Sequence, residues 1–277
     1  MIDSKELKQH ALAIRALTIE EIGSFGSGHI GGSMSIVEVL TYLYFCAMRI
    51  DPQNPRKEDR DRFVCSKGHA GPAVYATLAR KGFFDQSLLK TLNQGGTNLP
   101  SHCDMNKTVG VDFTAGSLGQ GFSAAVGIAL GQKIRNMDAF TYAIIGDGES
   151  QEGQIWEAAQ TANHWKLGNL IAFTDYNKQQ LDGYVNDVSD MEYIETRWLG
   201  FNWHVQRING HSFEQLDRAV ENAKKVTDRP SMIILDTIKS YGYLPGEGVT
   251  ANHSMPINAD SAAKAIADLY EREGVSL

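Results

Sequence analysis

A carboxylate and an amide at a fixed spacing are the residues of this chain best placed to do chemistry. Asp147 lies within the sequence Gly-Asp-Gly at residues 146–148, and Asn177 follows thirty residues after Asp147. Both side chains offer hard oxygen atoms, which suit a Mg²⁺ ion that also holds phosphate oxygens. The two glycines let the backbone approach a ligand closely. The pair therefore predicts a site for Mg²⁺ and a phosphorylated ligand.

The segments around these two residues are predicted to bring them together. Residues 141–145 (TYAII) and 170–173 (LIAF) are short apolar runs typical of buried strands, and residues 155–165 between them form a helical pattern. Two parallel strands joined by a helix end on the same edge of an open α/β sheet, where such sheets bind ligands. Asp147 and Asn177 are therefore expected to be neighbours, and the following helix can direct its amide groups at an anion.

Gly-Asp-Gly followed about thirty residues later by Asn resembles the thiamin diphosphate (ThDP) motif, and five further blocks resemble the transketolase family. These blocks are Ser27-Gly28-His29, residues 66–69 (SKGH), residues 116–121 (GSLGQG), Asp182-Gly183 and residues 253–256 (HSMP). A single Gly-Asp-Gly would be weak evidence, because Asp-Gly also forms ordinary turns. Six blocks in the family's order, spread over residues 27–256, make the resemblance specific.

The resemblance implies a cofactor site for ThDP and Mg²⁺. The metal ligands that it implies are Asp147, Asn177 and the main-chain carbonyl oxygen of Gln179. The cofactor-binding residues that it implies are His69, Gly116, Ser117, Leu118, Gly148, Asn177 and His253. A glycine-rich loop suits a diphosphate because its amide groups can face the anion; its alternative interpretation is a tight turn with close helix packing.

Four of the eight histidines lie in loops rich in Gly, Pro or polar residues, namely His29, His69, His102 and His253. Taken alone, each would more often be a structural residue than a catalytic one, but all four match family positions. Imidazole groups can bind hydroxyl groups and transfer protons near neutral pH. The resemblance implies catalytic roles for His29, His102 and His253, with His29 and His102 binding hydroxyl groups of a ketose. Of the remaining four, His10, His164 and His204 are expected to be structural or surface residues, and His211 is expected to serve a turn before a helix.

Two glutamates have two competing interpretations. Glu152 and Glu157 match family glutamates near the subunit interface, between two active sites, which they could link. Carboxylates at the start of a helix are also favoured simply by the helix dipole.

Strands alternate with helices along the whole chain, which predicts an α/β fold with a parallel sheet covered by helices on both faces. Residues 1–277 are expected to form a single ThDP-binding domain. The other expected elements are a helix over residues 7–22, a helix opened by a capping box at Ser35–Glu38, a strand at 63–65, a helix with Pro72 in its first turn, a buried helix over 123–134, strands at 203–205 and 232–235, a helix opened by a capping box at Ser212–Gln215, and a helix over 259–270.

Residues 26–31 also fit the dinucleotide pattern GxGxxG. That motif requires a preceding strand. The residues before it have a helical pattern instead, so NAD binding is not expected.

The composition excludes several classes of protein. A net charge of −7 argues against nucleic-acid binding, which needs a basic face. The N-terminus lacks the form of a signal peptide, and the longest apolar run, residues 39–48, is too short to cross a membrane. The three cysteines are widely spaced, which argues against disulfide and metal frameworks and favours the cytoplasm.

The transketolase family activates its cofactor with a glutamate from a second, pyrimidine-binding domain, and no glutamate of this chain matches it. The chain therefore resembles the N-terminal subunit of a split transketolase, which would need a separate C-terminal subunit. The expected reaction moves a two-carbon ketol unit from a ketose phosphate to an aldose acceptor, as in pentose phosphate metabolism. The expected assembly is a homodimer core or a heterotetramer.

Two alternatives remain open. A subunit of a ThDP-dependent 2-oxo acid dehydrogenase would share the metal and cofactor architecture, but pyruvate needs fewer hydroxyl partners than the loop histidines provide. A non-catalytic binding module would not need the intact pair Asp147 and Asn177.

Overall fold

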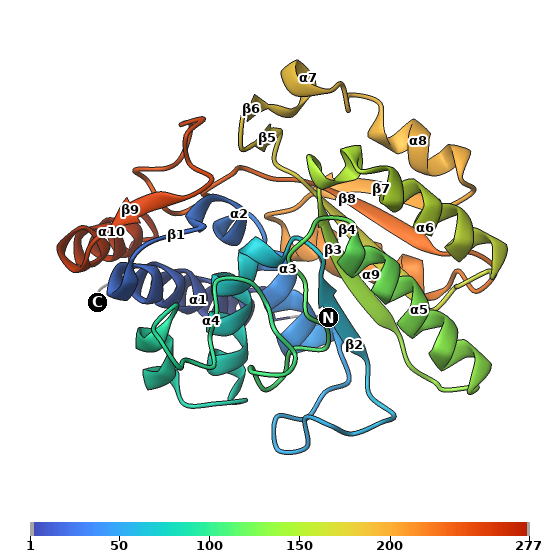
Figure 1. Ribbon diagram of the computed structural model, residues 1–277, viewed down its shortest axis with the longest axis horizontal. Coiled ribbons are helices and arrows are strands. Elements are labelled where there is room, and N and C mark those ends of the chain that lie inside the picture. The colour runs from blue at the N-terminus through green and yellow to red at the C-terminus, as the bar shows by residue number, and fades with distance from the viewer. Residues whose placement is uncertain (1–2, 276–277) are drawn as a thin grey trace.

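A five-stranded parallel sheet forms the centre of the computed structural model, which describes residues 3–275 (Figure 1). The strands lie in the order β2-β3-β4-β8-β7, and all neighbours in it are parallel. Their bounds are Arg62–Cys65 for β2, Thr141–Gly146 for β3, Leu170–Tyr176 for β4, Ser231–Asp236 for β8 and His204–Asn209 for β7. Strands β3 and β4 are buried along their whole length, as expected for a sheet covered on both faces. The predicted α/β fold is confirmed.

Alternate residues of the strands face two separate apolar clusters, one on each side of the sheet. Tyr142 and Ile144 of β3 belong to the first cluster, and Ala143 and Ile145 belong to the second. The helices that contribute to the first cluster are α1 (Ser4–Phe25), α3 (Val37–Tyr42), α4 (Gly71–Lys81), α9 (Phe213–Lys224) and α10 (Ala259–Arg272). Those that contribute to the second are α5 (Gln120–Ile134), α6 (Gly153–His164) and α8 (Ile194–Gly200). Ile134 is 68% exposed, so the helix predicted to be buried over 123–134 is buried on one side only.

Shorter elements connect this framework. They are the α-helices α2 (Ile30–Met34) and α7 (Val185–Val188), the 3₁₀ or π turns η1 (Leu43–Ala47), η2 (Gly68–Ala70), η3 (Gln86–Thr91) and η4 (Glu149–Gln151), and the strands β1 (Gly26–Gly28), β5 (Gln179–Gln180), β6 (Gly183–Tyr184) and β9 (Met255–Ile257). None of the helices within residues 3–275 combines the length and the hydropathy of a transmembrane segment.

The register of β3 against β4 places the two motif residues beside each other. Gly146 pairs with Asp175, so Asp147 and Asn177 each follow the end of one of two adjacent strands. The amide of Asp147 continues the pairing by donating to the carbonyl oxygen of Asp175 at 3.2 Å. The predicted proximity of Asp147 and Asn177 is confirmed.

Residues 26–31 follow a helix and not a strand, as the sequence indicated. Strand β1 pairs antiparallel with β9, with Gly28 opposite Met255. This pairing joins a segment after the first helix to a segment before the last one. It brings His29, directly after β1, close to His253, two residues before β9.

The capping box predicted at Ser35–Glu38 is wrong. Helix α3 begins at Val37 without a side-chain cap. Ser35 donates its hydroxyl to Asp175 at 2.7 Å, and the carboxylate of Glu38 forms an ion pair with Arg15 at 2.7 Å. Both side chains are buried, and partners distant in the sequence replace the local cap.

Two other expectations are confirmed only in part. Ser212 caps α9 by accepting a hydrogen bond from the amide of Gln215, but the Gln215 side chain accepts from the amide of Asn209 instead of reaching back to Ser212. Strand β7 begins at His204, so Trp203 of the predicted strand lies outside it. The indole of Trp203 packs in the second apolar cluster instead.

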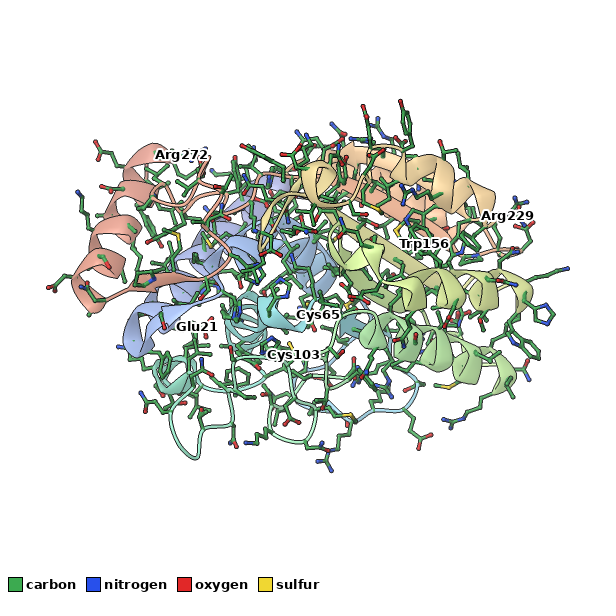
Figure 2. The ribbon with its side chains drawn as sticks, turned by 45° about the horizontal axis from the view of Figure 1, so that its top comes forward. Glu21, Cys65, Cys103, Trp156, Arg229 and Arg272 are labelled. Atoms are coloured by element: carbon green, nitrogen blue, oxygen red, sulfur yellow. The ribbon has the colours of Figure 1, made fainter. Side chains whose placement is uncertain are left out.

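Glu21 on α1 is a buried carboxyl group outside the candidate site (Figure 2). It is 0% exposed, and neither of its oxygens has a hydrogen-bond partner among the described residues. Burial, and secondarily the charge of Glu20, raises the pKa of Glu21 well above its usual value. Above the usual pKa of a glutamate, the unfolded chain has released this proton whereas the folded chain still holds it. The free energy of unfolding therefore falls as the pH rises from the usual pKa toward the raised one.

Replacing Glu21 by Gln will remove this pH dependence. The midpoint of thermal unfolding of Glu21→Gln will exceed that of the wild type at pH 8 by about 2–4 °C or more, and the difference will shrink toward pH 5. Differential scanning calorimetry at both pH values measures it. Glu58→Gln is the matched control, because Glu58 is exposed and pairs with Arg135 at 2.8 Å. A difference that is the same at pH 5 and pH 8 would contradict the assignment of a protonated Glu21.

Candidate active site

A pocket with a volume of about 390 Å³ lies at the carboxyl ends of the central strands. The loops that follow β2, β3, β4 and β8 contribute to its walls. Ten of the predicted site residues line it, namely His29, His69, His102, Gly116, Leu118, Asp147, Gly148, Asn177, Gln179 and His253. Ser117 is exposed and is not among the lining residues. The folded chain therefore brings together residues that are separated by more than two hundred positions in the sequence.

Asp147 is a buried carboxylate held by two backbone amides. Its Oδ1 atom accepts from Gly148 N at 2.7 Å and its Oδ2 atom accepts from Lys178 N at 2.6 Å. Burial, followed by the charge of Asp175, raises the pKa of Asp147 to about 7. A raised pKa means that the surrounding positive charge does not fully compensate the carboxylate. A divalent cation would supply the missing charge.

The amide of Asn177 is oriented by Asp175, a residue that the sequence did not single out. Asn177 Nδ2 donates to Asp175 Oδ2 at 2.8 Å, and Asn177 Oδ1 accepts from the amide of Gln179 at 3.0 Å. Lys67 Nζ lies 2.6 Å from the same Asp175 oxygen. Burial alone would raise the pKa of Asp175, but Lys67 and the hydroxyl donors around it keep that pKa below its usual value. The signal for this role of Asp175 was a charged residue within a buried strand, directly after the apolar run 170–173.

The oxygen set around Asp147 is typical of Mg²⁺ and not of zinc. Among residues 3–275, no three His, Cys, Asp or Glu side chains are grouped to hold a metal ion. The candidate ligands are instead one carboxylate, one side-chain amide and one main-chain carbonyl. Because Mg²⁺ is commonly bound by one or two carboxylates together with phosphate oxygens and water, this set fits it.

The four loop histidines form one cluster in the pocket. The ring centroid of His29 lies 5.3 Å from that of His102 and 5.2 Å from that of His253, and the ring centroids of His69 and His253 are 4.9 Å apart. Burial is the main cause that lowers the pKa of each ring, and that of His253 falls to about 4 with a contribution from Lys239. The imidazoles are therefore neutral at pH 7, so each offers one hydrogen-bond donor and one acceptor.

Two lysines add positive charge to the pocket, and the sequence analysis missed both. Lys67 is paired with Asp175, whereas Lys239 is buried and its hydrogen bond is a long one, 3.4 Å to the carbonyl oxygen of Gln180. Burial, together with the charge of Lys67, lowers the pKa of Lys239 to about 8. Two buried cations facing one pocket suit a polyanionic ligand such as a diphosphate. Lys239 is an isolated lysine three residues after β8, and no local pattern marks it.

The glycine-rich loop combines both interpretations that its sequence allowed. Gly116 lines the pocket, and a Cβ atom added to it would meet no other atom within 4 Å. Gly121 instead packs against the neighbouring loop, because a Cβ atom there would lie 2.7 Å from the Cα of Ser66. The start of the loop is thus open to a ligand and its end is fixed by packing.

The two glutamates with competing interpretations occupy different places. Glu152 lines the pocket, and Glu157 lies on an exposed face of α6. Their link to a second active site stays a prediction.

His211, predicted to serve a turn, is part of a buried network. Its Nε2 atom accepts from the amide of Ile238 at 3.0 Å, so its Nδ1 atom carries the proton that Glu38 accepts at 3.0 Å. The ring also stacks on Tyr241 at 3.9 Å. His211 thereby fixes the segment that carries Lys239.

The chain is similar to known proteins in both sequence and structure. The family model described as "Transketolase, thiamine diphosphate binding domain" matches residues 7–271. A 6-deoxy-6-sulfo-D-fructose transketolase subunit from Clostridium sp. (strain MSTE9) is 55% identical, over 97% of this chain and 98% of that protein. One of the subunits of the apulose-4-phosphate transketolase from Phocaeicola vulgatus is 37% identical, over 93% of this chain and 92% of its own length. The solved transketolase of Campylobacter jejuni superimposes with a TM-score of 0.90 at 31% identity, over 99% of this chain but 44% of that one.

Proposed function

The chain belongs to the transketolase family, and from this membership we propose that it is the ThDP-binding subunit of a two-chain transketolase. The observation that carries this proposal is the pattern of coverage. The chain spans 98% and 92% of two proteins that are named as transketolase subunits, and less than half of the solved transketolase of Campylobacter jejuni. The enzyme formed with its partner would transfer a two-carbon ketol unit from a ketose to an aldose.

The residues of the pocket fit the cofactor that the family binds. Mg²⁺ would be held by Asp147, Asn177 and the main-chain oxygen of Gln179, where it would compensate the buried carboxylate. When bound, ThDP supplies the nucleophilic carbon and the electron-accepting ring that cleavage of a ketol carbon–carbon bond requires. The cofactor would be lined by Gly116, Leu118 and Gly148 of the same pocket, together with the neighbouring Ser117. Its diphosphate would contact His69 and His253 and be attracted by the two lysines, Lys67 and Lys239.

The histidine cluster would act on the sugar. A neutral imidazole accepts a proton from a hydroxyl group at one ring nitrogen and donates a hydrogen bond from the other. His29, His102 and His253 are close enough to one another to contact adjacent hydroxyl groups of one polyol. The lowered pKa values keep these rings available as proton acceptors at neutral pH. This arrangement favours a sugar donor over pyruvate, and hence a transketolase over a 2-oxo acid dehydrogenase.

The donor is proposed to be a ketose with an anionic group at its far end. A ketose phosphate is the first candidate. A sulfonated ketose is the second, because the relative that is 55% identical is named for 6-deoxy-6-sulfo-D-fructose. Ketol transfer by the assembled enzyme, measured with each donor and a common aldose phosphate, distinguishes the two. Activity on neither donor, with turnover of pyruvate instead, would contradict the proposed function.

The partner is proposed to be a separate chain that carries the pyrimidine-binding domain. Leu181, an apolar side chain that is 67% exposed, lines the pocket, and Tyr193, 66% exposed, lines a separate hollow together with Lys178, the residue that follows Asn177. A partner that covers them would remove apolar surface from water. We propose that the assembly is a homodimer core or a heterotetramer. Its partners include no nucleic acid and no membrane, and it acts in the cytoplasm. Residues 1–277 are proposed to form one domain.

Replacing His29 by Ala will affect the sugar and not the cofactor. We expect kcat/KM for the donor to fall about 100-fold, since a proton-transferring or hydroxyl-binding group is removed. The affinity for ThDP will be unchanged, because the neighbouring His69 and His253 remain. Steady-state kinetics and calorimetric titration of the assembled enzyme measure the two quantities. His164→Ala is the control, because His164 is exposed on α6; wild-type kinetics in His29→Ala would disprove the role of His29.

A further inference from the structure

Glu149 is a buried carboxylate in the wall of the pocket, and its bonds leave it no free role in chemistry. It begins η4, directly after Gly-Asp-Gly, and is 2% exposed. Oε1 accepts from the amide of Gly119 at 2.9 Å, and Oε2 accepts from the amide of Gly146 at 2.9 Å. The hydroxyl of Ser66 also donates to Oε1. Three donors therefore occupy the carboxylate.

The three donors lie in, or directly beside, three different loops of the proposed cofactor site. Ser66 opens the loop 66–69, which ends in His69. Gly119 follows the residues Gly116 to Leu118. Gly146 is the last residue of β3 and precedes the proposed metal ligand Asp147. One side chain thus joins the parts of the backbone that carry a histidine, the glycine-rich loop and the metal ligand.

The glycine-rich loop depends on its two ends for its position. Gly116 and Ser117 are exposed, and nothing packs on the Cβ position of Gly116. Before them, the amide of Ala115 donates to the carbonyl oxygen of Cys103 at 3.0 Å. After them, Gly119 has a φ of +85° and gives its amide to Glu149. Glu149 therefore fixes one of the two ends of the segment that would face the diphosphate.

We propose that Glu149 is a positioning residue for the cofactor, which holds the three loops in the arrangement that receives the diphosphate. An ionised acceptor forms stronger hydrogen bonds than a neutral one, so a carboxylate suits a junction of three donors. A loop that is already ordered loses less entropy when its ligand binds. The inference rests on the proposed function, because it assumes that this pocket binds ThDP.

The test is the isosteric substitution Glu149→Gln in the assembled two-chain enzyme. In one orientation of the new amide, its NH₂ group faces the amide of Gly146. In the other, it faces the amide of Gly119 and the hydroxyl of Ser66. In both orientations at least one buried donor loses its acceptor. We expect the Kd for ThDP, measured by calorimetry with saturating Mg²⁺, to rise about 10- to 100-fold. Turnover at saturating ThDP will stay close to the wild-type value, because Glu149 does not touch the reacting groups. Glu221→Gln, an exposed carboxylate paired with Lys224 at 2.9 Å, is the control and will leave both quantities unchanged.

Hydrogen exchange of the cofactor-free enzyme distinguishes positioning from a general structural role. In Glu149→Gln, residues 115–120 will exchange faster, whereas β3 and β4 will keep their protection. Loss of protection throughout the sheet, or unchanged protection with unchanged ThDP affinity, would overturn the inference.

If Glu149→Gln does not fold, Ser66→Ala is the second test of the same role. Removing one of the three donors will weaken ThDP binding about three- to tenfold, and wild-type affinity would refute the role. Failure of the wild-type enzyme to bind ThDP would instead disprove the proposed function itself.

Discussion

Replacing Asp147 by Ala will weaken ThDP binding about 100-fold in the presence of Mg²⁺, the size expected when one member of a buried charged pair is removed. Asp147 is the one carboxylate among the three proposed metal ligands. Without it, the ion would keep only neutral protein ligands, and the charge of the diphosphate would be poorly compensated. The Lys178 amide, which donates to Asp147 at 2.6 Å, would also lose its acceptor, so the loop after β4 would loosen.

Calorimetric titration of the assembled enzyme with ThDP and Mg²⁺ measures this effect. Asn177→Ala will act in the same direction but more mildly, because an amide oxygen carries no net charge. Asp59→Ala is the matched control, since Asp59 is exposed and pairs with Lys57 at 3.3 Å. Unchanged ThDP affinity in Asp147→Ala would rule out the metal assignment.

The elements that carry the motif could be predicted from the sequence because their signals are local. Strands β3 and β4 are short apolar runs, and parallel pairing places their ends on one edge of the sheet whatever surrounds them. The sequence alone therefore predicts that Asp147 and Asn177 are neighbours. The four loop histidines were found from their agreement with family positions, and the fold brings all four into one pocket.

The residues that the sequence analysis missed act through contacts between distant segments. Lys67 and Asp175 are far apart along the chain but form a buried ion pair of 2.6 Å. Glu149 joins three loops, and nothing in its local sequence distinguishes it from an exposed turn residue. The wrong capping box at Ser35 has the same cause, because its hydroxyl bonds to Asp175 instead of to the start of a helix. Local patterns locate elements, whereas long-range hydrogen bonds decide the roles of buried polar residues.

The chain on its own will have less than about one hundredth of the ketol-transfer activity of the assembled enzyme, as expected when a proton-transferring group worth about 10²–10⁴ in rate is missing. The carboxylates that line the pocket within residues 3–275 are Asp147, Glu149 and Glu152. Asp147 is proposed to bind the metal, and Glu149 is occupied by three donors. Glu152, exposed at the start of α6, is not among the residues matched to the activating glutamate. That glutamate is therefore expected to come from the partner's pyrimidine-binding domain.

The most direct test of this account measures ketol transfer with three preparations: this chain alone, the candidate partner alone, and an equimolar mixture. Each is supplied with ThDP, Mg²⁺, a phosphorylated or sulfonated ketose and an aldose phosphate, and the aldose product is followed over time. The mixture will transfer the ketol unit, and neither chain alone will exceed about one hundredth of its rate. Robust turnover by this chain alone would contradict the assignment as one subunit of a two-chain transketolase.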